Sequence, residues 1–156
     1  MQTFTERFEA ANGGPIQHEG RELQKSFSLP VKKGDSFELR FLRAAERPVQ
    51  GLGLKCEGCK LMIADTVAAS IALWTDTAPE SVSIQVVKAK PGARVIIFNQ
   101  WRDEKYGSTM YHLNNAAMEI VPQPDGWITL RCSDGWGDPD FNDLIAALRL
   151  KPRQAQ

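Results

Sequence analysis

The stretch that decides the fold is Ser36-Phe37-Glu38-Leu39-Arg40-Phe41. Its three apolar residues alternate with polar ones, so in an extended chain they all point to one face. This period of two is typical of a strand that buries one face against a core and exposes the other to water. The same alternation recurs in residues 81–86 and 128–132.

Further β-rich runs occupy residues 70–74, 94–98 and 117–121, and turn-forming clusters of Gly, Pro, Asp and Asn separate the runs. About ten short strands at a spacing of roughly 10–12 residues predict an all-β protein, a β-sandwich or jelly roll. We expect residues 21–150 to form this single domain. An irregular N-terminal arm, residues 1–20, with room for a short helical start, precedes it. A polar tail, residues 151–156, follows it.

Residues 143–150 present one local conflict. Strong helix formers follow Asn142 and Asp143, which are good helix caps, so the segment taken alone predicts a helix. In a strand, however, its leucines and Ala146 would share one face. Because tertiary context overrides local propensity, we expect a closing strand after the earlier ones.

Composition excludes several classes of protein. The chain has 156 residues, 42% of them apolar and 24% charged, which is ordinary for a globular domain. Nineteen basic residues balance nineteen acidic ones, so the basic excess typical of a nucleic-acid binder is absent. No segment approaches the roughly 18 continuous apolar residues of a membrane helix. The polar start carries no signal-peptide pattern, so we expect a cytoplasmic protein, with export by a non-classical route as the alternative.

The three cysteines are an odd number, which argues against a closed disulfide framework. Cys56-Glu57-Gly58-Cys59 has the spacing of half a zinc site, and the other soft ligands stand at no recognisable spacing: Cys132, His18 and His112. We favour a hairpin in which Glu57-Gly58 is a two-residue turn between strands at 51–55 and 60–64. A metal or redox pair is the alternative.

The most distinctive segment is an acidic turn, Ser133-Asp134-Gly135-Trp136-Gly137-Asp138-Pro139-Asp140-Phe141-Asn142-Asp143. Hard divalent cations prefer several oxygen ligands, and the alternate spacing of three of these side chains lets a curled loop aim them at one point. Without a cation, so many carboxylates would repel one another. The turn therefore predicts a calcium site with these ligands: Asp134, Asp138, Asp140, Asn142 and Asp143.

The EF-hand is the first calcium motif to test, since it also uses alternate ligands. It requires glycine at the sixth loop position and glutamate at the twelfth. Counted from Asp138, those positions hold Asp143 and Arg149, so the turn is not an EF-hand.

The pattern Asp-Gly followed by Asp-x-Asp-Phe-Asn-Asp and an apolar strand resembles the calcium loop of bacterial fucose/mannose-binding lectins. That resemblance implies that Asp138, Asp140, Asn142 and Asp143 are cation ligands and that sugar hydroxyls complete the shell. Residues 73–79, 99–102 and 114–118, followed by the turn, also resemble uncharacterised bacterial β-sandwich domains that end in an Asp-x-Asp-Phe-Asn-Asp-Leu segment. This second resemblance implies a fold and no activity.

Several alternatives stay open for the turn. Asp and Asn often cap their own turns, so a metal-free structural turn anchored by Phe141 explains the same residues. Trp136 and Phe141 are not expected to be buried together, and an exposed Trp136 could stack on a sugar ring or a partner. A half-buried tryptophan at the base of the loop is the alternative. Arg102 could pair with the turn if the loops share one end and take part in ligand binding.

Catalysis is the weakest alternative. His18 and His112 lie outside any nucleophile motif, and a hydrolase would need two carboxylates in different environments. We therefore predict a binding module and not an enzyme. It would be calcium-dependent and recognise carbohydrate or a protein surface, with a metal-free interaction domain as the rival.

Overall fold

The computed structural model describes residues 2–151 and confirms the all-β prediction, with 57% of residues in strands and 5% in a helix. Twelve strands follow one short helix. At the N-terminus lie α1 (Phe4–Ala10), β1 (Ile16–His18) and β2 (Arg21–Leu23). The main sheet consists of β3 (Phe27–Pro30), β4 (Ser36–Ala44), β5 (Gln50–Ile63), β6 (Thr66–Ala68), β7 (Ser70–Trp74), β8 (Ser81–Arg102), β9 (Thr109–Met110), β10 (Ala117–Pro122), β11 (Ile128–Ser133) and β12 (Leu144–Lys151).

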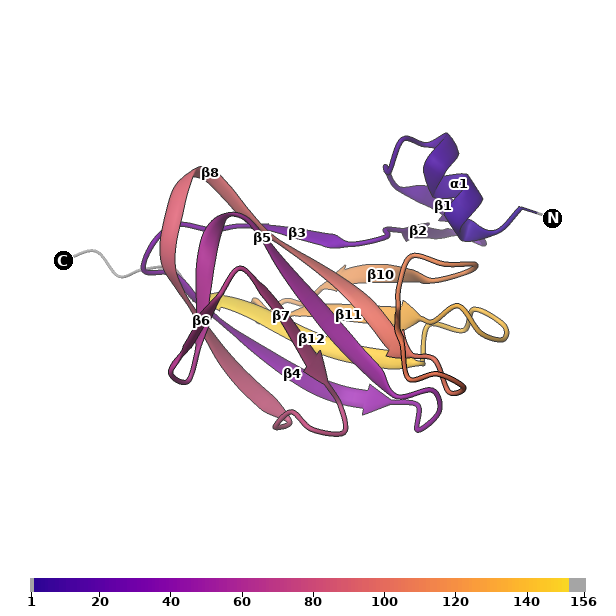
Figure 1. Cartoon of the computed structure of the whole chain (residues 1–156). Helices are drawn as coiled ribbons and strands as arrows, with labels where there is room; N and C mark the ends of the chain where they lie inside the picture. Colours follow the sequence, from indigo (N-terminus) through magenta and orange to yellow (C-terminus); the bar gives the residue numbers. More distant parts are fainter. Residues whose placement is uncertain (1, 152–156) are drawn as a thin grey trace.

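The ten strands of the main sheet form a sandwich-like fold because two very long strands bend together (Figure 1). The first half of β8 pairs with β4 and with the last residues of β5, in the layer that continues through β12 and β11 to β10. The second half of β8 pairs with β3 and with the first half of β5, which in turn pairs with β7. All of these pairs are antiparallel.

The predicted hairpin at Glu57-Gly58 is absent, and a bend within the single strand β5 stands in its place. β5 runs through these residues, and the register with β8 shifts between Glu57 and Cys59. Gly58 has a φ of 79°, the left-handed conformation that a glycine adopts equally well in a hairpin turn and in a β-bulge. The prediction was wrong because pairing with β8 continues on both sides of the bulge.

The alternation in β4 is confirmed, since Phe37, Leu39 and Phe41 all belong to the main core. The closing strand is also confirmed: β12 pairs with both β11 and β4, and Leu144 is fully buried. Apart from Lys151, the last residue of β12, the predicted polar tail lies outside the described residues.

The N-terminal arm contains the short helical start for which the sequence left room, and β1 follows it, so the arm is less irregular than predicted. Thr3 caps α1 by accepting a hydrogen bond from the Glu6 N–H, and Phe4 and Phe8 occupy one face of the helix. Both rings are buried in a second cluster that also contains Ile16, Leu23, Ala117 and Phe141. The arm is ordered because it buries apolar surface against the end of the sandwich. Within residues 2–151, no helix has the length and apolar character needed to cross a membrane.

Candidate functional site

Three segments meet at one end of the sandwich, which we call the loop end: α1, the loop between β9 and β10, and the acidic turn between β11 and β12 (Figure 1). The Thr5 N–H donates to the Asn114 carbonyl at 3.0 Å, and Asn114 Nδ2 donates to the Gly135 carbonyl at 3.4 Å. Gly135 lies directly over Trp101, where a Cβ atom would stand 2.8 Å from the indole ring. The close approach of the turn to the core therefore requires glycine at this position.

Asp134 anchors the acidic turn from inside. Its side chain is buried, and one carboxylate oxygen accepts from Gln50 Nε2 at 2.8 Å while the other accepts from the Trp136 N–H at 2.8 Å. Its own N–H donates to the Asp143 carboxylate at 2.9 Å. These bonds tie both ends of the turn to each other and to β5.

The middle of the turn is held in the same way. Asp140 Oδ1 accepts from the Asn142 N–H at 3.0 Å, and Asn142 Oδ1 accepts from the Arg131 guanidinium at 2.9 Å. The Phe141 N–H donates to Ser133 Oγ at 2.8 Å, which fixes Phe141 at a φ of 60° with its ring in the second core cluster. Four of the five predicted cation ligands thus accept hydrogen bonds from the protein itself.

The predicted ligands do not converge as a set. Among residues 2–151, no group of three or more His, Cys, Asp or Glu side chains is arranged to hold a metal ion. Asp138 lines a groove against α1, whereas Asp134, Asp140 and Asp143 do not.

The carboxylates of the turn nevertheless influence one another. The pKa of Asp143 is raised to about 6. Burial is the main cause, the hydrogen bond from the Asp134 N–H opposes it, and the charges of Asp134 and Asp140 add to it. Burial also raises the pKa of Asp134, and Asp140 adds to the effect. The turn therefore holds like charges close together.

A groove of about 780 Å³ separates α1 from the acidic turn. Its lining includes Arg7, His18, Glu19, Asn115 and Asp138. The Arg7 guanidinium lies 3.2 Å from His18 Nδ1 and donates to the Gln17 carbonyl. Asn115 Oδ1 accepts from the Phe4 N–H at 3.1 Å. The groove thus combines donors, acceptors and charges of both signs.

Trp136 is 61% exposed and Phe141 in the same turn is buried, so the prediction that the two are not buried together is confirmed. It follows Gly135, which the Leu113 carbonyl approaches from the facing loop. That loop also exposes Tyr111 and Leu113. The loop end therefore presents large apolar side chains to solvent beside its polar groove.

Arg102 does not pair with the acidic turn, so that part of its prediction was wrong. Its guanidinium donates to Asp76 Oδ2 at 2.6 Å and lies 4.4 Å from the centroid of the Trp74 ring. The reason is its place at the end of β8, beside the turn that follows β7. Its predicted role in ligand binding stays a prediction.

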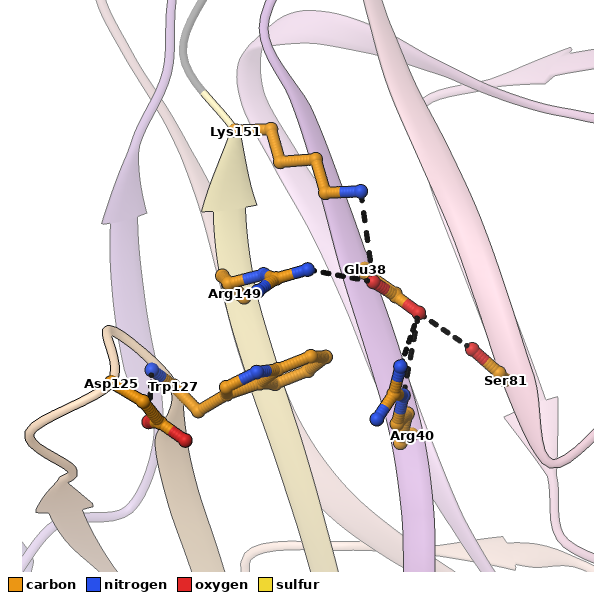
Figure 2. A network of polar contacts seen from close by, with 7 residues as sticks. All are labelled: Glu38, Arg40, Ser81, Asp125, Trp127, Arg149 and Lys151. Atoms are coloured by element: carbon orange, nitrogen blue, oxygen red, sulfur yellow. Dashed lines mark hydrogen bonds and ion pairs between the residues drawn. The ribbon is translucent and has the colours of Figure 1, made fainter.

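The sheet carries a second polar network, around Glu38 (Figure 2). The Glu38 carboxylate accepts from Ser81 Oγ at 3.0 Å and from Arg40 at 3.1 Å, and it forms ion pairs with Arg149 and Lys151 at 3.5 and 3.7 Å. The hydrogen bond from Ser81, followed by the contacts with Arg40 and Lys151, lowers the pKa of Glu38. Both arginines also lie 4.6 Å from the Trp127 ring. One carboxylate here is surrounded by cations.

Sequence reasoning missed the groove and two residues that shape it, Arg7 and Asn115. The spacing of Phe4 and Phe8 was the available signal, because an i,i+4 apolar pair predicts a helix that packs on something. It also missed Gln50, which no motif marks. Of the other histidines and cysteines considered, His18 lines the groove, whereas Cys132 is buried in the main core.

No protein-family model, curated protein or solved structure matches the chain. The resemblances of the acidic turn therefore stay predictions. The features that bear on function are the groove and the exposed Trp136 at the loop end.

Proposed function

We propose that the protein is a carbohydrate-binding module that takes its ligand at the loop end, in the groove between α1 and the acidic turn. The observation that carries the proposal is the combination of this groove with Trp136, which is 61% exposed two residues from Asp138.

The chemistry of the groove suits sugar hydroxyls, each of which donates and accepts hydrogen bonds. Asp138 supplies acceptors, the Arg7 guanidinium supplies donors, and the Asn115 amide supplies both. An exposed indole can cover the apolar face of a sugar ring. The lining also has apolar members, Phe4 and Pro139, so a protein surface stays the rival partner.

The turn is also held in place before any ligand arrives. Hydrogen bonds from Gln50 to Asp134, from Asp134 to Asp143 and from Phe141 to Ser133 fix its backbone. Because these groups are already ordered, ligand binding loses little conformational entropy.

A glycan array in the presence of EDTA tests the proposal. The wild-type protein should bind a defined set of glycans, and Trp136→Ala and Asp138→Asn should each lose that binding. Tyr106→Ala is the matched control, since Tyr106 is an aromatic residue 75% exposed on another loop. The absence of glycan binding by the wild type, with a protein captured instead, would replace carbohydrate by a protein surface as the partner.

Calcium dependence is a second candidate, favoured by the raised pKa of Asp143. A bound cation would relieve the repulsion among Asp134, Asp140 and Asp143, and a cation that binds the native state alone raises the melting temperature. Millimolar calcium should then raise the melting temperature of the wild type and leave Asp140→Ala unchanged, with Asp125→Ala, in the turn before β11, as the control. An equal shift in both variants would reject a site in the acidic turn.

The proposal is one of binding without turnover, and the hydrolase alternative makes the opposite prediction. A glycan incubated with the protein should be recovered intact by mass spectrometry. Cleavage that disappears in Asp138→Asn and Asp143→Asn would instead make the turn catalytic.

A further inference from the structure

The outer face of the layer that contains β4, β12 and β11 carries an excess of positive charge. Phe37 and Leu39 of β4 point into the core, so Glu38 and Arg40 lie on the outer face, and Arg149 of β12 pairs with Glu38 there. The cations of this face, which we call the basic face, are Arg40, Arg43, Arg131, Arg149 and Lys151. The strands β4, β8, β10, β11 and β12 contain two acidic residues, Glu38 and Glu119.

Trp127 holds two of these cations in place. The guanidinium carbons of Arg40 and Arg149 each lie 4.6 Å from the centroid of its ring, and Figure 2 shows the two side chains reaching the ring from neighbouring strands. The Trp127 N–H in turn donates to Asp125 Oδ1 at 3.1 Å. Guanidinium groups that already rest on an aromatic ring lose less conformational freedom when they bind a ligand.

The cations exceed what Glu38 neutralises. Its one carboxylate is in contact with three of them, Arg40, Arg149 and Lys151. A guanidinium has five N–H donors and an ammonium three, so two carboxylate oxygens cannot satisfy them all. The Glu38 side chain is 17% exposed, whereas those of the three cations are 48%, 37% and 56% exposed. Donors and positive charge are therefore left facing the solvent.

The surplus donors suit carboxylates, which guanidinium groups bind through paired N–H bonds, and clusters of arginine recognise acidic segments of other proteins. Nucleic acid fits less well. Glu38 and Glu119 would repel a phosphate backbone that passed over them, whereas a peptide can place neutral residues at those points. The chain as a whole also has equal numbers of acidic and basic residues, without the basic excess of a nucleic-acid binder.

We propose that the basic face binds an acidic segment of a partner protein, whose carboxylates pair with Arg40, Arg149 and Lys151. The site lies on the sheet and uses neither the groove nor the acidic turn. It is therefore independent of the proposed carbohydrate site at the loop end.

Fluorescence anisotropy of a labelled oligo-glutamate peptide, titrated with the full-length protein at low salt, tests the proposal. The peptide should bind saturably, and added salt should weaken the binding because these charges are partly exposed. A labelled oligo-lysine peptide should not bind. An oligo-glutamate peptide that fails to bind, or single-stranded DNA that binds more tightly than the peptide, would overturn the proposal.

Variants separate a defined site from general attraction between charges. Arg149→Gln and Lys151→Gln should each weaken peptide binding by about three- to fivefold, whereas Lys105→Gln, at an exposed lysine on the loop after β8, should have no effect. Trp127→Leu changes no charge, yet it should weaken binding by about threefold because the two guanidinium groups lose their support.

Two further variants sharpen the test. Glu38→Gln should strengthen peptide binding, since it removes the carboxylate that competes for the same cations. Trp136→Ala at the loop end should bind the peptide like the wild type, so the two sites fail or succeed separately. Unchanged binding in Trp127→Leu, or an equal loss in Lys105→Gln, would show unspecific attraction and overturn the proposal.

Discussion

Two groups of carboxylates in this protein are arranged in opposite ways. Glu38 stands on the exposed face of the sheet with Ser81, Arg40, Arg149 and Lys151 around it (Figure 2). The acidic turn instead places Asp134, Asp140 and Asp143 near one another with few cations. The surroundings lower the pKa of the sheet carboxylate and raise the pKa of the turn carboxylates.

The ion pairs around Glu38 stabilise the folded sheet, whereas the carboxylates of the acidic turn do not stabilise the fold through ion pairs. On the sheet, β4 and β12 supply three cationic side chains for the one carboxylate of Glu38. In the turn, the fold keeps like charges close together although this costs stability, and it does so beside a groove and an exposed tryptophan. Asp134 and Asp143, whose pKa values are raised, do not line the groove themselves, but they belong to the same turn as Asp138, which does.

The largest effect is expected where the turn is anchored to the core. Phe141→Ala removes a ring that is 3% exposed and packs with α1, and a buried Phe→Ala change costs about 3–5 kcal/mol. Urea denaturation should show this loss. Leu42→Ala, on the exposed face of β4, should cost far less. Equal losses would mean that the turn is not anchored through Phe141.

A smaller loss is expected from Asp134→Ala. The change removes the acceptor of one N–H of the buried Gln50 amide, which keeps its bond to the Pro48 carbonyl, and the acceptor of the partly buried Trp136 N–H, at a cost of about 1–3 kcal/mol. Thermal melting measures the effect. Asp138→Ala, in the groove of the same turn, should melt like the wild type, and a similar loss in both variants would contradict the structural role of Asp134.

Removing the charge of Asp143 should increase stability, because burial first, and the charges of Asp134 and Asp140 after it, disfavour the ionised form. The folded pKa of Asp143 is about 6, above the unfolded value of about 3.9, so the native state holds the proton more tightly. The stability of the wild type should therefore fall as the pH rises from roughly 4 to 6. Asp143→Asn keeps an acceptor for the Asp134 N–H and should raise the stability at neutral pH by about 1 kcal/mol, after allowance for solvent screening. If Asp143→Asn were less stable than the wild type at neutral pH, the claim that the ionised Asp143 carboxylate is unfavourable in the folded protein would be contradicted.

The sheet network should show the opposite dependence on pH, with the smallest effect. Because the folded pKa of Glu38 is lowered, its contribution is present above the unfolded value and is lost as the pH falls through the folded one. Glu38→Gln should melt slightly below the wild type at neutral pH, and the gap should close in acid or in high salt. If the difference in melting temperature between Glu38→Gln and the wild type grew as the pH fell, the lowered pKa of Glu38 would be contradicted.

The sequence predicted the layers of the fold far better than the site. Alternation in β4 and β12 reports which face is buried, and that information is local, so the strands around Phe37 and Leu144 were predictable. The bend of β5 was not, because a glycine with positive φ serves a turn and a bulge equally well, and the pairing with β8 decides between them.

The candidate site depends on contacts between distant segments. Asp134 meets Gln50 from another strand, and the groove forms only when α1 packs against the acidic turn. The residue types of the turn were visible in the sequence, and so was the expectation that Trp136 and Phe141 are not both buried. The donors that hydrogen-bond to the side-chain oxygens of the turn, such as Gln50, could not be predicted, because no short-range sequence pattern marks them.

The most direct test of the loop end is calorimetric titration, in EDTA, of the glycan that the wild-type protein binds most strongly on the array. Trp136→Ala and Asp138→Asn should each weaken binding by about tenfold or more, while Glu38→Gln on the sheet should bind like the wild type. An equal loss in the sheet variant, or unchanged binding in both loop-end variants, would contradict the assignment of the site.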